Sequence, residues 1–101
     1  MDIASYEVLR KAPRASDEYW GLSQYITGIG EGYGWANAQL QQEKQPLLFC
    51  APKSFAMNSE NYLQILDEAI AKHRESWQQI KVPIGGILLF ALRLKLPCES
   101  K

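Results

Sequence analysis

The chain has 101 residues, of which 47% are hydrophobic and 22% charged, and its 11 basic residues balance its 11 acidic ones. A chain of this length forms one domain with a small core, and the lack of a basic excess argues against a nucleic-acid partner. The most apolar stretch, residues 84–92, is far shorter than the roughly 18 apolar residues of a membrane-spanning helix, so no membrane span is predicted.

The spacing of apolar residues predicts a first pair of helices. Residues 3–11 form a short helix that ends before Pro13, and Ser16 and Asp17 are residue types that cap a helix start. Apolar residues at helical spacing then predict a long amphipathic helix over residues 17–42. A glycine inside a helix costs about 1 kcal/mol relative to alanine. Close packing of another helix, or a kink, would explain why this helix holds Gly21, Gly28, Gly30, Gly32 and Gly34.

The second half of the chain predicts two loops and two helices. Residues 41–57 form the main loop, and the next helix begins at Asn58 or Ser59. Residues 73–81, polar apart from Trp77 and Ile80, are predicted to form a second loop. Pro83 suits the first turn of a last helix over residues 84–96, which is apolar on nearly all sides and therefore expected to lie at the centre. The predicted fold class is all-α: a small single-domain bundle of about four helices.

No set of catalytic residues stands out. The glycines of residues 28–34 interrupt a helical pattern without a strand before them, which argues against a phosphate-binding loop. His73, the only histidine, stands between Lys72 and Arg74 and is interpreted as a cation at a helix end. Cys50 lies in a proline-containing loop, which favours a disulfide over a nucleophile. Two distant cysteines and one histidine do not supply four zinc ligands. We expect no enzyme activity, no metal and no cofactor.

Cys50 and Cys98 allow one intramolecular pairing. Each stands beside a proline at the edge of a predicted element, and from the count of cysteines alone a disulfide and two unrelated buried thiols are equally open. A bond would close a loop of about 49 residues and stabilise the fold by on the order of 4 kcal/mol through loop-closure entropy.

Trp77 in the predicted second loop also has two interpretations. The side chain is either an anchor packed into the core or a binding contact, since aromatic residues are enriched among interface hot spots. Residues 1–6 lack the basic region and hydrophobic run of a signal peptide. The protein is therefore either cytosolic or secreted with its leader already removed.

Three segments carry a resemblance to a known family. They read Tyr-Ile-Thr-Gly-Ile-Gly-Glu-Gly (residues 25–32), Phe-Cys-Ala-Pro (49–52) and Ala-Leu-Arg-Leu-Lys-Leu-Pro-Cys (91–98). In this order they resemble the signatures of the Rap/Tai immunity proteins, namely a helix with Gly-Tyr-Ile-x-Gly-x-x-(Asp/Glu)-Gly, a Phe-Cys-x-Pro loop and a closing Ala-Leu-x-x-x-Phe-Pro-Cys. The resemblance covers about residues 19–98.

The resemblance implies a small helical protein of the Gram-negative periplasm, whose leader has been removed, with a Cys50–Cys98 disulfide and a homodimeric state. Its partner would be a peptidoglycan amidase effector injected through the type VI secretion system. The chain departs from the family at three positions. Family members often carry a cysteine where Leu22 stands and a glycine where Gln24 stands, and Leu96 replaces a phenylalanine. A single disulfide is therefore expected.

An immunity protein of this kind occludes the active site of its target and needs no chemistry of its own. Exposed loops on a rigid frame suit that task, so the predicted effector contacts are Arg74, Glu75, Trp77 and Gln78 in the loop over residues 73–81. A periplasmic structural or chaperone-like stress protein without a toxin partner is the alternative, and an amidase gene beside this one would argue against it. A cytosolic enzyme subunit is a third class, which two free thiols would favour.

Overall fold

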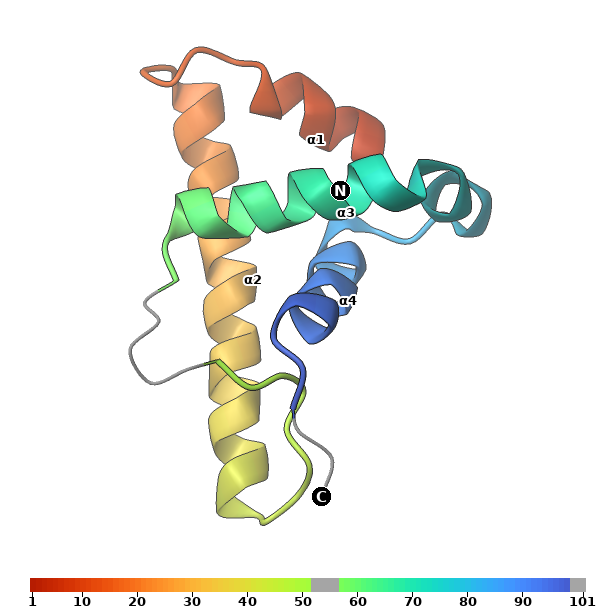
Figure 1. The fold of residues 1–101 in the computed structure, drawn as a ribbon. Helices are drawn as coiled ribbons and strands as arrows, with labels where there is room; N and C mark the ends of the chain where they lie inside the picture. The colour runs from red at the N-terminus through yellow and green to blue at the C-terminus, as the bar shows by residue number, and fades with distance from the viewer. Residues whose placement is uncertain (52–56, 99–101) are drawn as a thin grey trace.

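The computed structural model describes residues 1–51 and 57–98 and is all-α, as predicted. Within these residues the chain forms four helices and no strand: α1 (Ile3–Arg10), α2 (Asp17–Gln42), α3 (Ser59–Ile80) and α4 (Ile84–Lys95). Figure 1 shows α3 crossing the N-terminal half of the long helix α2, with α1 beside that same half and α4 packed against α3. The C-terminal half of α2 extends beyond this crossing, and the loop after α2 runs back along it.

Side-chain caps fix the starts of the first three helices. Asp2 accepts a hydrogen bond from the Ser5 N–H, and Ser16 accepts one from the Tyr19 N–H. Asn58 forms a capping box, in which its side chain and that of the residue three positions later each accept from the other's backbone N–H. These caps satisfy N–H groups that a helix start leaves without a partner. They explain why α2 and α3 begin where the sequence predicts.

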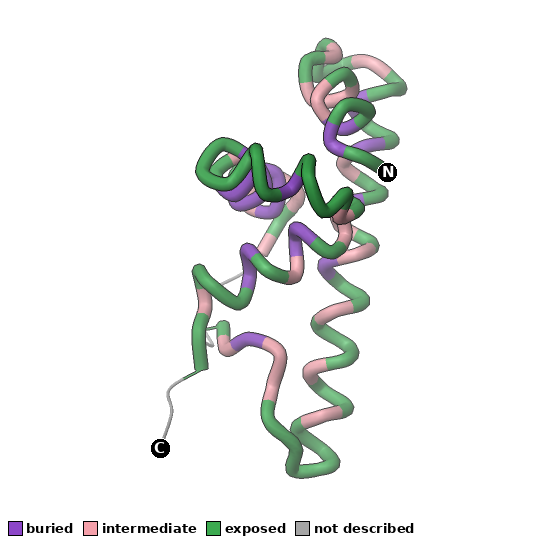
Figure 2. The backbone as a smooth tube through the Cα atoms, turned by 90° about the vertical axis from the view of Figure 1, so that its right-hand side faces the viewer, coloured by how far each residue is buried: buried purple, intermediate pink, exposed green. Residues whose placement is uncertain are grey.

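The core lies where α2, α3 and α4 meet, and α4 is its centre. Four side chains of α4 have no exposed surface, which confirms the predicted central position of this helix: Ile84, Ile87, Leu88 and Leu92. Figure 2 shows the buried residues gathered where the helices cross, while the far end of α2 is exposed or half-buried. Burial of a large aliphatic side chain contributes about 1.5–3 kcal/mol, so α4 holds the bundle together.

A chain of polar contacts joins α1 to the core helices along one side. The buried Tyr6 hydroxyl donates to a carboxylate oxygen of Asp67 at 2.7 Å, and Arg10 Nε donates to the other carboxylate oxygen at 3.0 Å. Arg10 also donates to the Tyr19 hydroxyl at 2.8 Å, and that hydroxyl donates to Glu60 at 2.9 Å. Among the described residues, no buried side-chain polar atom lacks a hydrogen-bond partner, as a stable interior requires.

The prediction of a loop over residues 73–81 is wrong, because α3 continues to Ile80. The helix kinks at His73, where φ is −131° and ψ is 31°, and ends only at Lys81 in the left-handed region. Residues 73–76 are polar because the bent segment faces solvent, not because the chain leaves the helix. His73 accordingly lies at a kink inside α3 and not at a helix end, so its interpretation as a helix-terminal cation is also corrected.

The disulfide that the resemblance implied is present between Cys50 and Cys98, whose Cα atoms lie 4.9 Å apart. Beside it the Cys50 N–H donates to the Leu96 carbonyl oxygen at 2.8 Å. The disulfide and this hydrogen bond tie the loop after α2 to the end of α4. Pro52, the last residue of the Phe-Cys-Ala-Pro segment, lies outside the described residues.

The same loop is held to α2 by one side chain. The Asn37 amide donates to the Phe49 carbonyl oxygen at 2.8 Å and accepts from the Leu48 N–H at 2.7 Å. These two bonds replace the strand or helix partners that the loop backbone lacks. The loop thus has a fixed path between α2 and α4 as far as the disulfide.

The glycines of α2 divide into two groups. A Cβ atom at Gly30 would overlap the ring of Tyr62, so the prediction of close helix packing is confirmed at this position. At four other glycines, a Cβ would meet no atom of another described residue within 4 Å beyond the local helix backbone: Gly21, Gly28, Gly32 and Gly34. Packing among the described residues therefore explains one of the five.

Candidate binding surface at the bend of helix α3

The bend of α3 is the most exposed helical segment of the second half of the chain. All residues from 71 to 76 are exposed, whereas a helix that lies flat on a core buries at least one residue in each turn. The kink at His73 turns the helix away from the core before Trp77 brings it back. The segment is thus an exposed corner built from helix, in the place where the sequence predicted an exposed loop.

Trp77 lies on the inner side of this corner. Its side chain is 6% exposed, and its indole Nε1 donates to the Ala69 carbonyl oxygen at 3.0 Å. The ring packs edge-on against Phe90 of α4, with 5.0 Å between ring centroids. Of the two interpretations of this tryptophan, core packing is the one that the structure bears out. Trp77 supports the bend from within and offers little surface to a partner.

Arg74 is held in place by α1. Two of its guanidinium nitrogens donate to the two carboxylate oxygens of Glu7, at 3.0 and 2.8 Å. These charge-assisted bonds lower the pKa of Glu7 and raise the pKa of Arg74. Since both side chains are more than a third exposed, the pair contributes little to stability. Its effect is to fix where the guanidinium stands.

Glu75 and Gln78 complete the outer side of the bend. Both are exposed, and on an α-helix positions 74, 75 and 78 fall within an arc of about 100°. The structure therefore brings Arg74, Glu75 and Gln78 onto one outward side, with Trp77 beneath them. Three of the four predicted contact residues share a surface, and the fourth lies in the core behind it.

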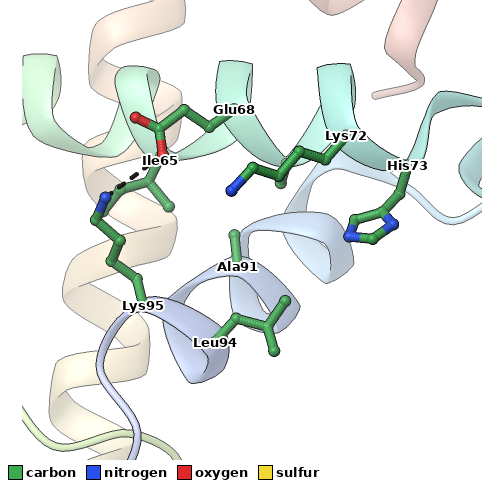
Figure 3. Close-up of a pocket in the computed structure, with 8 residues that line it drawn as sticks. Ile65, Glu68, Lys72, His73, Ala91, Leu94 and Lys95 are labelled. Carbon is green, nitrogen blue, oxygen red and sulfur yellow. Dashed lines mark hydrogen bonds and ion pairs between the residues drawn. The ribbon is translucent and has the colours of Figure 1, made fainter.

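A shallow groove of about 130 Å³ lies beside the bend, between α3 and α4 (Figure 3). Lys72 and His73 extend from α3 over Ala91 and Leu94 of α4, and Lys95 reaches back to Glu68 at 3.4 Å. Ile65 and Ala69 of α3 complete the wall. Sequence reasoning missed this groove.

The signal that could have found the groove is the apolar outer side of α4. Phe90 is 42% exposed and Leu94 61% exposed, although this helix, apolar on nearly all sides, was expected to lie at the centre. Leu94 therefore lies exposed between Lys72 and Lys95, and a protein partner can cover a surface of this kind. The groove is smaller than the several hundred cubic ångströms of a small-molecule site, so a protein surface fits it better than a free ligand.

His73 is held beside the groove by two aromatic rings. The His73 ring packs edge-on against Trp77 and Phe90, with centroid distances of 6.2 and 6.1 Å. Across residues 1–51 and 57–98, no three His, Cys, Asp or Glu side chains are grouped so that they could hold a metal ion. None of the helices described here combines the length and the apolar character needed to cross a membrane.

Comparison of the chain with protein-family models, with curated proteins and with solved structures gave no match.

Proposed function

We propose that this chain is an immunity protein that binds a type VI secreted peptidoglycan amidase and covers its active site. The observation that carries the proposal is the Cys50–Cys98 disulfide, because it joins the second and third of the segments that resemble the Rap/Tai proteins. The first segment lies on α2, whose Asn37 holds the same loop. Disulfides persist in oxidising compartments, which supports a periplasmic location.

The bend of α3 is the proposed contact surface for the amidase. Its outer residues Arg74, Glu75 and Gln78 are polar and stand on a helix, and Trp77 and Glu7 fix that helix from both sides. A surface that is already ordered loses little conformational entropy when it binds. Inhibition then needs only shape and hydrogen bonding at the amidase cleft, so the protein acts without catalysis. A homodimer is part of the proposal and would present two such bends.

The experiment uses the oxidised protein and the amidase encoded beside its gene. Hydrolysis of purified peptidoglycan is followed with increasing amounts of the protein, and affinity is measured by calorimetry. We expect hydrolysis to stop near one protomer per amidase. An amidase that is neither bound nor inhibited contradicts the proposal. The structural or chaperone-like alternative predicts that outcome together with suppressed aggregation of unrelated unfolded proteins.

A matched pair of variants tests the contact surface. Gln78→Arg places a bulky charge on the bend, and Gln64→Arg makes the same change on an exposed position of α3 before the kink. The two positions lie about 21 Å apart along a straight helix. We expect Gln78→Arg to weaken amidase binding at least about tenfold, the effect of roughly 1.4 kcal/mol, and Gln64→Arg to leave it unchanged. Equal affinities for the two variants would move the contact surface away from the bend.

A further inference from the structure

The side of α2 that faces away from the core carries large aromatic residues in water. Trp35 is 76% exposed, Trp20 66% and Tyr25 42%. Figure 2 shows the long helix along one edge of the molecule, with α3, α4 and the following loop on its inner side. We define the outer face of α2 by its exposed residues Trp20, Gly21, Gln24, Tyr25, Gly28, Glu31, Gly32, Trp35 and Ala36.

Glycines alternate with these aromatic residues although no packing contact within residues 1–51 and 57–98 requires them. A Cβ at Gly21, Gly28 or Gly32 would meet no heavy atom within 4 Å, and each glycine costs about 1 kcal/mol relative to alanine inside a helix. A second helix packed closely on this face would cover both the exposed aromatic side chains and the backbone at the glycines. The face lacks any such partner within the described chain.

The order of large and small residues makes this face complementary to itself. When two copies of α2 run antiparallel with a two-fold axis at position 28, residue n of one copy stands opposite residue 56 − n of the other. Three of the opposed pairs then set a large side chain against a small one, and the two backbones meet at Gly28. The opposed pairs are Trp35 with Gly21, Trp20 with Ala36, Gln24 with Gly32, and Gly28 with itself.

The polar groups of the face also find partners in this arrangement. Tyr25 stands opposite Glu31, so the phenolic O–H can donate to the carboxylate that is the only charge at the centre of the face. A parallel pairing would instead set each residue against its own copy. It would oppose the two Glu31 carboxylates and stack the two Trp35 side chains, with no small residue opposite either. The antiparallel register is therefore the one that the sequence of this face favours.

We propose that the outer face of α2 binds the same face of a second copy of this chain, antiparallel, with the two-fold axis at Gly28. This assignment rests on the homodimer of the proposed function and names the surface that forms it. The helix is about 39 Å long and about 10 Å wide, so it offers a strip of about 400 Å² per copy. This is below the about 800 Å² per partner of a standard interface, so we expect a dissociation constant in the micromolar range. Because α3 packs on the opposite side of α2, the bend of α3 stays open in the dimer.

Two glycine substitutions test the surface without any amidase, so failure here is distinct from failure of the immunity function. Gly28→Leu fills the proposed axis, and Gly34→Leu makes the same change about 120° away on the same helix. Neither new side chain has a neighbour at its Cβ, and both raise helix propensity, so both variants fold. Mass is measured by sedimentation equilibrium from low micromolar to near-millimolar concentration.

We expect the wild type and Gly34→Leu to form dimers with the same dissociation constant, and Gly28→Leu to raise that constant at least about tenfold. A wild type that stays monomeric at the highest concentration overturns the proposal. Equal dimerisation of Gly28→Leu and the wild type overturns it as well.

Cysteine cross-linking tests the antiparallel register. Gly28→Cys places two thiols beside the axis, within the about 7 Å between Cα atoms that a disulfide allows, so oxidation gives a covalent dimer. Trp35→Cys places its two thiols about 21 Å apart and gives none. Peptide mapping checks that Cys50 and Cys98 stay paired. A parallel dimer would cross-link both variants, and that result overturns the register.

Discussion

The indole nitrogen of Trp77 donates to the carbonyl oxygen of Ala69, eight residues earlier, across the kink of α3. In a straight helix these residues lie about 12 Å apart along the axis, so the bond depends on the bend at His73. The same indole packs against Phe90 of α4. One side chain therefore fixes both the angle within α3 and the position of its last turns on the core.

Substitution of Trp77 separates these two contributions. Trp77→Phe keeps an aromatic ring but removes the donor, and we expect a loss of about 1 kcal/mol. Trp77→Ala also leaves a cavity, and we expect a loss of about 3–5 kcal/mol. Urea denaturation followed by circular dichroism measures both. Equal free energies of unfolding for the Phe variant and the wild type would show that the hydrogen bond contributes nothing to the bend.

The ionisation of the Tyr6 hydroxyl is expected to lower the stability of the fold at alkaline pH. Its hydroxyl is buried and donates to Asp67, and burial together with that carboxylate raises the pKa of Tyr6 well above its usual value. The unfolded tyrosine ionises at about pH 10. The stability that Tyr6 contributes is therefore complete below about pH 10 and is lost as the pH rises above it.

We expect Tyr6→Phe to lower the free energy of unfolding by about 1 kcal/mol at neutral pH and to flatten its fall at alkaline pH. The wild type, titrated in parallel at the same protein concentration, is the reference for this slope. Urea titrations at a series of pH values measure both effects. An unchanged slope in Tyr6→Phe would assign the alkaline loss to other groups.

Alanine in place of two glycines of α2 is expected to change stability in opposite directions. A Cβ at Gly30 overlaps the Tyr62 ring, whereas one at Gly34 meets nothing within 4 Å. We expect Gly34→Ala to stabilise the chain by up to about 1 kcal/mol through helix propensity, and Gly30→Ala to destabilise it by about 1–3 kcal/mol through overpacking. Thermal unfolding of the two variants at low concentration checks the signs. Stabilisation by both would contradict the packing of α2 on α3.

The disulfide predicts a large dependence of stability on redox state. Cys50 and Cys98 are 48 positions apart, and a loop of this length stabilises by about 4 kcal/mol through loop-closure entropy. The double variant Cys50→Ala, Cys98→Ala is expected to lose about that amount in urea denaturation. The wild type in excess reductant is the control and should match the variant. A loss below about 1 kcal/mol would show that the loop is held by Asn37 and the Cys50 backbone without the bond.

The sequence was sufficient to predict the elements whose ends carry local signals. Ser16 and Asn58 are caps, and the apolar period after each predicted α2 and α3. The end of α3 could not be predicted in this way, because its bend exposes one run of polar residues and the apolar period stops. Contacts distant in sequence hold these residues in a helix, from Trp77 to Ala69 and Phe90 and from Arg74 to Glu7, and no local pattern encodes them.

The sequence predicted which residues form the candidate surface, but it did not predict that they stand on a helix. Arg74, Glu75 and Gln78 were expected to be exposed and they are, while Trp77 turned inward because its aromatic area is worth more in the core than in water. The groove beside the bend depends on which side of α4 meets α3. An apolar pattern all round that helix cannot tell one side from another.

The length of α2 has a hydrodynamic consequence. At about 39 Å this helix accounts for nearly all of the molecule's longest extent of 42 Å, against a shortest extent of 19 Å. The radius of gyration is 14.2 Å, above the about 13 Å of a compact domain of 100 residues. A single copy therefore experiences more drag than a sphere of its mass and tumbles slowly about its short axes. Two copies joined along α2 would gain thickness without length, so the frictional ratio should fall as the mass doubles.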